Sequence, residues 1–138
     1  NHVRPWQHVL DLLSGYLLLG ETLLEKKDSN VGPWNFGPCL SDHIDVWSTV
    51  KIMESFWSQI AFKKSKQKNP QEETATLKLN SEKAQNILNW KPIWGGSTMF
   101  KKTVEWYKSF YSKQKVLSNQ QLYDYLDDAE SIATWANN

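Results

Sequence analysis

Near its N-terminus the chain reads Arg4-Pro5-Trp6-Gln7-His8-Val9 and continues as Leu10-Asp11-Leu12-Leu13-Ser14-Gly15-Tyr16. Pro5 has no N–H and fixes its own φ, and it pushes Arg4 into the β or polyproline II region. The guanidinium of Arg4 therefore stands on a stiff, extended backbone just ahead of an apolar helix. A planar fork of donors that keeps its charge suits a phosphate group. Taken alone, Arg4 is equally well explained as a surface residue of a frayed terminus, but its setting between Pro5, Trp6 and His8 favours ligand binding.

The composition predicts one domain that binds neither nucleic acid nor membrane. A length of 138 residues suffices for one domain with a core. The 16 Lys plus Arg balance 15 Asp plus Glu, so the chain has no long-range field to attract nucleic acid. The longest apolar run, from Tyr16 to Leu19, is too short for a membrane span, and the first residues do not read as a signal peptide. The single Cys39 excludes an internal disulfide and fits a reducing compartment, so we expect a cytoplasmic protein.

Apolar residues at helical spacing predict five helices. In the first, from Asp11 as N-cap to about Lys26, the apolar stripe is predicted to make a well-buried helix; it consists of Leu13, Tyr16, Leu17 and Leu24, widened by Leu12, Leu19 and Leu23. The other helices are expected at about 46–60, 80–89, 98–113 and 119–136, and short strands at 34–36 and 75–79. Long helices with short strands between them predict an α+β fold.

The eight tryptophans divide by their position along these elements. Those on or beside helical stripes are expected in the core, namely Trp47, Trp57, Trp106 and Trp135. Those at the ends of elements could wall a pocket, namely Trp6, Trp34, Trp90 and Trp94. Of the latter, Trp90 and Trp94 are better explained as packing against the first helix than as stacking on a base.

Several blocks occur in an order that resembles one enzyme family. They are the Arg4 to Val9 block with its helix, Trp34-Asn35-Phe36-Gly37, Pro70-Gln71-Glu72, Asn80-Ser81-Glu82-Lys83-Ala84, and the helix end Leu88-Asn89-Trp90-Lys91-Pro92. This order is similar to the C-terminal substrate lobe of extended short-chain dehydrogenases/reductases. The Gln7-His8 pair, the leucine-rich helix and the ending Thr103-Val104-Glu105-Trp106-Tyr107 look most like the CDP-glucose 4,6-dehydratases. The resemblance runs from about residue 1 to residue 111, and residues 112–138 are expected to form a helical tail that packs on this lobe or serves an oligomer contact.

The resemblance implies a substrate-binding surface and a bound cofactor in the full-length parent. It assigns substrate binding to Arg4, Trp6, Asn35, Gln71 and Glu72, with Arg4 on the diphosphate, Asn35 beside the phosphates or sugar, and Glu72 on the nucleotide ribose. A family member is an NAD-dependent lyase that converts CDP-glucose to CDP-4-dehydro-6-deoxyglucose and water in deoxysugar biosynthesis, O-antigen sugars included, and is expected to be a homo-oligomer. The chain departs from the family pattern at Asn69 and Gln71, where related proteins carry an arginine and a histidine.

The catalytic and cofactor-binding residues of the family are not expected in this chain. It has no glycine-rich dinucleotide fingerprint, so the N-terminal Rossmann half is expected to be absent and the fragment alone to be inactive and to bind no NAD. Tyr111 and Lys115 match the Tyr-x-x-x-Lys spacing but follow the substrate lobe, which makes Tyr111 a core-edge aromatic instead. Asp42, His43 and Asp45 are interpreted as capping residues rather than as metal ligands. The alternatives are another nucleotide-sugar epimerase or dehydratase, and a stand-alone aromatic module that binds a carbohydrate or a partner helix.

Overall fold

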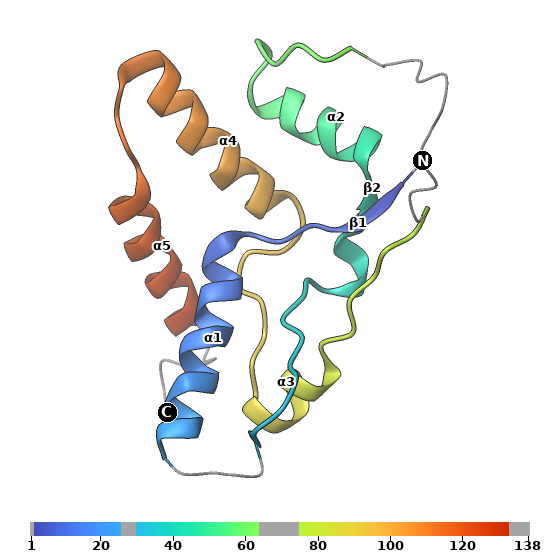
Figure 1. Cartoon of the computed structure of the whole chain (residues 1–138). Coiled ribbons are helices and arrows are strands. Elements are labelled where there is room, and N and C mark those ends of the chain that lie inside the picture. The colour runs from blue at the N-terminus through green and yellow to red at the C-terminus, as the bar shows by residue number, and fades with distance from the viewer. Residues whose placement is uncertain (1, 26–29, 64–74, 133–138) are drawn as a thin grey trace.

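The computed structural model describes residues 2–25, 30–63 and 75–132, which form a helix-rich α+β arrangement (Figure 1). Within these residues the helices are α1 (Val9–Leu24), α2 (Val46–Phe56), α3 (Glu82–Leu88), α4 (Gly96–Lys113) and α5 (Ser118–Ser131), with a short 3-10 helix η2 (Leu40–Asp42). The strands are β1 (Val3–Pro5) and β2 (His43–Asp45). The five helices and the α+β class are therefore confirmed. None of the helices in the described part combines the length and the apolarity that crossing a bilayer requires.

The sheet is small and holds the Arg4 strand at its centre. β1 pairs antiparallel with β2, so that Arg4 lies opposite Ile44. On the other edge of β1, the Val3 N–H donates to the Ala75 carbonyl over 2.9 Å and the Leu77 N–H donates to the Val3 carbonyl over 3.1 Å. The strand predicted at 75–79 is reduced to this single bridge between Val3 and Thr76.

The strand predicted at 34–36 is wrong, because this segment has no regular secondary structure. Phe36 is buried in the core, and the next backbone N–H, that of Gly37, donates to the side chain of Ser81 over 2.7 Å instead of to a neighbouring strand. A backbone group that is satisfied by a side chain no longer needs a sheet partner. The segment is therefore fixed without being a strand.

Two clusters of buried side chains make up the core. The first contains Phe36, Ala84, Leu88 and Trp90 and is covered by the α1 residues Leu12, Leu18 and Leu19. The second contains Trp94, Met99, Phe100 and Tyr125, against which Trp6, Leu10, Met53 and Phe56 pack. Trp90 and Trp94 are 1% and 2% exposed. The Trp90 indole N–H donates to Ser14 and the Trp94 backbone N–H to Asp11, both in α1, so the prediction that they pack against the first helix is confirmed.

Two predictions about α1, its N-cap and its buried face, differ from the structure. Its N-cap is His8 rather than Asp11, which lies fully buried in the first turn. Four residues of the apolar stripe predicted to be buried are instead exposed, namely Leu13, Tyr16, Leu17 and Leu24, by 45%, 57%, 73% and 85%. Leu12 and Leu19, which widen the predicted stripe, do pack against the core. Gly15 marks the face that packs, because a Cβ there would lie 2.4 Å from a ring carbon of Phe36. The helix is apolar on two sides. The side that packs on the core is the one with Gly15, because only there can the Phe36 ring approach the helix backbone closely.

The remaining helices differ from prediction in smaller ways. α2 ends at Phe56 because Trp57 takes an extended conformation, four residues before the predicted end at Ile60. Trp47 was expected in the core but is 46% exposed, and Tyr111 is 65% exposed rather than at a core edge. In α5, Tyr125 and Ala129 are buried as predicted, whereas Leu122 is exposed, as is Ile132 just after the helix. Trp135 lies outside the described residues.

Candidate functional site

Arg4 lies in the middle strand of three extended segments. Its backbone is held by β2 on one side and by the Ala75–Leu77 segment on the other. Its side chain is half-buried, and Nη1 donates to the carbonyl of Val3 over 2.8 Å. The extended conformation predicted from Pro5 is confirmed. Because the backbone is already fixed, binding an anion would order only the side chain of Arg4.

Trp6 anchors the end of the same strand. Its indole N–H donates to the carbonyl of Ile44 over 3.1 Å, and its ring meets Phe100 edge to face with centroids 6.2 Å apart. The indole thus ties β1 to β2 and to α4. This contact fixes the end of the strand that carries Arg4, while a contact between Trp6 and a substrate stays a prediction.

Asn35 is exposed between two anchored neighbours. Phe36 meets Trp90 edge to face in the core, and the indole N–H of Trp34 donates to the Asn30 carbonyl over 2.8 Å. The Lys83 ammonium lies 4.0 Å from the Trp34 ring centroid, a cation–π contact that closes the other side. The amide of Asn35 is therefore presented to solvent from a fixed backbone, as a hydrogen-bonding ligand site requires.

Gln71 and Glu72 lie outside the described residues, so their predicted substrate contacts stay predictions. The chain that follows them is tied to the Arg4 sheet at two described points. Thr76 bridges Val3, and the Leu79 N–H donates to Nε2 of His43 over 3.2 Å. Glu72 thus lies four residues in sequence before the bridge to the Arg4 strand.

A buried polar network behind the sheet was not foreseen from the sequence. Oδ1 of Asp11 accepts the Ile93 N–H over 2.6 Å and the Tyr125 hydroxyl over 2.9 Å. Ser14 Oγ accepts the Trp90 indole N–H over 3.0 Å and donates to the Asp11 carbonyl over 2.7 Å. The sequence patterns predict Asp11 as a helix cap, and place Ser14 and Tyr125 simply within apolar helices. The available signal was an Asp and a Ser three residues apart, on one face of a leucine-rich helix.

Burial controls the charge of this network. It raises the pKa of the Asp11 carboxyl, against the effect of the hydrogen bonds from Ile93 and Tyr125, and it also raises the pKa of Tyr125. Oδ2 of Asp11 is buried and has no hydrogen-bond partner among the described residues. The network joins α1, the connection before α4, and α5, and it has no contact with solvent through Asp11.

His8 caps α1 in its neutral form. Its Nδ1 accepts the Leu10 N–H over 3.3 Å, and its ring lies edge to face on Trp94 with centroids 4.7 Å apart. Burial, together with the charge of Lys102, lowers the pKa of His8 to about 4. A ring nitrogen that must accept a hydrogen bond has to be unprotonated, so the low pKa and the cap agree.

The glycine pair Gly95-Gly96, at the start of α4, offers no place for a dinucleotide phosphate. Oδ1 of Asp42 accepts the Gly96 N–H over 2.9 Å, and a Cβ at Gly95 would lie 2.8 Å from Oδ2 of Asp42. The start of α4 is thus already occupied by a carboxylate from the same chain. Asp45 caps α2 by accepting the Trp47 and Ser48 N–H groups, which confirms its predicted capping role. The described residues contain no cluster of three potential metal ligands.

Comparison with known proteins identifies a relative. No protein-family model matches the chain. Over 126 residues it is 33% identical to a curated protein of Salmonella typhimurium, and the match covers 90% of this chain. That protein is CDP-glucose 4,6-dehydratase. The resemblance predicted from the motifs is therefore confirmed. The matched region is 35% of the dehydratase, so this chain spans about a third of its relative's length.

Proposed function

We propose that this chain is the nucleotide-sugar-binding part of an NAD-dependent CDP-glucose 4,6-dehydratase. Such an enzyme converts CDP-glucose to CDP-4-dehydro-6-deoxyglucose and water. The observation that carries the proposal is the similarity to a dehydratase of that name over 90% of the chain. The constrained Arg4 strand supports it, because it presents a permanent cation where the motif requires one.

In this proposal the chain contributes positioning rather than bond breaking. Arg4 donates to oxygens of the substrate diphosphate, and charge-assisted bonds of this kind are about twice as strong as neutral ones. Asn35 hydrogen-bonds the phosphates or the sugar. The buried network at Asp11 and the Trp6 contact keep Arg4 in place, so that the sugar is held in one orientation for reaction.

NAD does not fit the described residues of this chain. The sequence lacks a dinucleotide fingerprint, and the glycine pair at α4 is occupied by Asp42. The proposal therefore assigns the cofactor to another part of the parent enzyme, and the roles of Arg4 and Asn35 do not depend on it.

The test is binding of CDP-glucose by a chimera in which this chain replaces the matching third of the Salmonella dehydratase. Arg4→Ala should raise the Kd for CDP-glucose about 10- to 150-fold, which corresponds to about 1.5–3 kcal/mol for hydrogen bonds to a charged group. Lys108→Ala removes an exposed cation from α4 instead and should leave the Kd unchanged. Calorimetric titration measures both.

Three results would contradict the proposal. An unchanged Kd in Arg4→Ala would remove Arg4 from the site. An equal loss of affinity for CDP-glucose in Arg4→Ala and Lys108→Ala would mean that binding depends only on overall charge. Binding of free glucose as tightly as CDP-glucose would favour the alternative of a carbohydrate-binding module, because such a module does not need the diphosphate.

A further inference from the structure

Two blocks that lie far apart in the sequence meet around Asn35. We call residues 33–37 the Asn35 loop and residues 80–84, which lead into α3, the α3 block. The Lys83 ammonium donates to the Pro33 carbonyl over 3.0 Å, and the Ser81 hydroxyl accepts the Gly37 N–H over 2.7 Å. These contacts join residues that are 50 and 44 positions apart in the sequence. The α3 block thus holds the Asn35 loop at both of its ends, with Asn35 between them.

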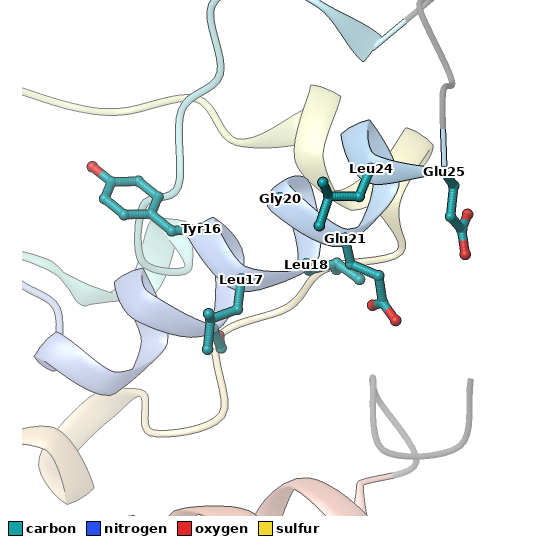
Figure 2. A pocket seen from close by; sticks show the side chains of 8 residues that line it. Tyr16, Leu17, Leu18, Gly20, Glu21, Leu24 and Glu25 are labelled. Atoms are coloured by element: carbon teal, nitrogen blue, oxygen red, sulfur yellow. The ribbon is translucent and has the colours of Figure 1, made fainter.

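The Gly37 end of the Asn35 loop is fixed by burial. A Cβ at Gly37 would lie 2.8 Å from the Cβ of Leu79 and 3.1 Å from the Ser81 hydroxyl oxygen, so the close approach requires glycine. Phe36 is buried in the core. Tyr16, which lines the hollow along α1 that Figure 2 shows, meets the Phe36 ring edge to face with centroids 5.8 Å apart. This end of the loop is therefore anchored by contacts other than those of Lys83.

The Trp34 end of the Asn35 loop lies at the surface. Pro33 is exposed, and Trp34 is only partly buried at the edge of the core. The indole N–H of Trp34 donates to the Asn30 carbonyl, a contact that stays within the same stretch of chain. The Lys83 ammonium lies 4.0 Å from the Trp34 ring centroid and also bonds the Pro33 carbonyl. One ammonium group thus joins two consecutive residues of the loop to α3.

We propose that Lys83 is a positioning residue for substrate binding, which holds Asn35 in place without touching the substrate. This inference rests on the proposed function, in which the Asn35 amide hydrogen-bonds the phosphates or the sugar. Asn35 is exposed, and fixing its backbone before binding reduces the freedom that is lost when a ligand binds. The Lys83 ammonium is already engaged by a carbonyl and a ring, which argues for this indirect role rather than for a phosphate contact.

The two contacts of Lys83 need both a positive charge and an N–H donor. An indole ring attracts a cation over its face, and a carbonyl accepts a hydrogen bond. Methionine has an unbranched side chain but neither a charge nor a donor, whereas arginine has both. Comparing Lys83→Met with Lys83→Arg therefore separates the contribution of the charged group from that of the side chain's bulk.

The experiment is a double-mutant cycle on the chimera defined above, with the Kd for CDP-glucose measured by calorimetric titration. Lys83→Met should raise the Kd about three- to tenfold, because the ordering of the loop costs about as much as the contacts that maintained it. Lys83→Arg should keep most of the affinity. In an Asn35→Ala background, Lys83→Met should have no further effect, since no amide is left to position. Lys108→Met removes an exposed lysine of α4 and should leave the Kd unchanged.

Circular dichroism checks that each variant is folded, and the cycle then separates the possible outcomes. An unchanged Kd in Lys83→Met would overturn the inference. A Kd raised by the same factor with and without the Asn35 amide would also overturn it, because Lys83 would then act on the substrate directly or on the lobe as a whole. In both cases, binding by the unsubstituted chimera and its loss in Arg4→Ala leave the proposed function intact. A folded, unsubstituted chimera that does not bind CDP-glucose would instead contradict the proposed function, and the inference with it.

Discussion

The inner and outer faces of α1 carry the same kind of side chain in different surroundings. Leu18 and Leu19 on the inner face pack against the cluster around Trp90, and Leu17 between Tyr16 and Leu18 points away from it. What distinguishes the inner face is not its leucines but Asp11, Ser14 and Gly15. These residues have partners fixed in geometry, whereas a leucine can be buried against many surfaces. In α1, therefore, the spacing of apolar residues identifies the helix, while its small and polar residues identify the side on which it packs.

Trp90→Ala should give the largest effect on the inner face. Trp90 is 1% exposed, and its indole N–H donates to Ser14. Removing a buried tryptophan costs about 3–5 kcal/mol in the free energy of unfolding, mainly through the cavity that it leaves. Urea unfolding followed by circular dichroism measures this. A loss below about 0.5 kcal/mol, the usual size for surface changes, would show that α1 is not held by this cluster.

Stability should fall in acid because His8 is buried at the start of the inner face. In the unfolded chain His8 takes up a proton near its ordinary pKa of 6.5, and in the folded chain only near about 4. Stability is therefore full above pH 6.5 and is lost as the pH falls toward 4, by about 3 kcal/mol in all. His8→Asn keeps an acceptor at the cap and removes this titration. Unfolding free energies at pH 7 and at pH 4 should differ less in His8→Asn than in the unsubstituted chain, and an equal pH dependence would contradict the assignment.

Leu18→Ala and Leu17→Ala compare the two faces directly with one substitution at adjacent positions. Leu18 packs on the core, so its loss should cost about 2 kcal/mol. Leu17 is 73% exposed, so its loss should change the unfolding free energy of the 138-residue chain by less than about 0.5 kcal/mol. Equal costs for the two variants would show that the outer face is covered within this chain.

Much of the fold could be predicted from the sequence because it depends on local signals. The helix periodicity, the break at Pro92 and the extended Arg4-Pro5 pair act within a few residues, and each appears in the structure. The strand predicted at 34–36 failed because Ser81, 44 residues from Gly37, supplies the hydrogen-bond partner. The orientation of α1 failed because it depends on the approach of Phe36 to Gly15. Spacing along the chain does not report such contacts.

The candidate site follows the same division. The conformation of Arg4 was predictable from Pro5, and the relative was predictable from the order of the motifs. The network of Asp11, Ser14 and Tyr125 was not, because its members are up to 114 residues apart. Trp6 was predicted at the substrate, and the contact observed for it is the carbonyl of Ile44. A conformation that is set by the neighbouring residue can be predicted from sequence, whereas a contact with a residue far along the chain cannot.

We propose that this chain binds a nucleotide sugar through its diphosphate. The most direct measurement is a parallel calorimetric titration of the chimera with CDP-glucose, UDP-glucose and free glucose. We expect saturable binding of CDP-glucose, weaker binding of UDP-glucose and no binding of glucose. Binding of glucose alone, or of none of the three by a chimera whose circular dichroism shows it to be folded, would contradict it.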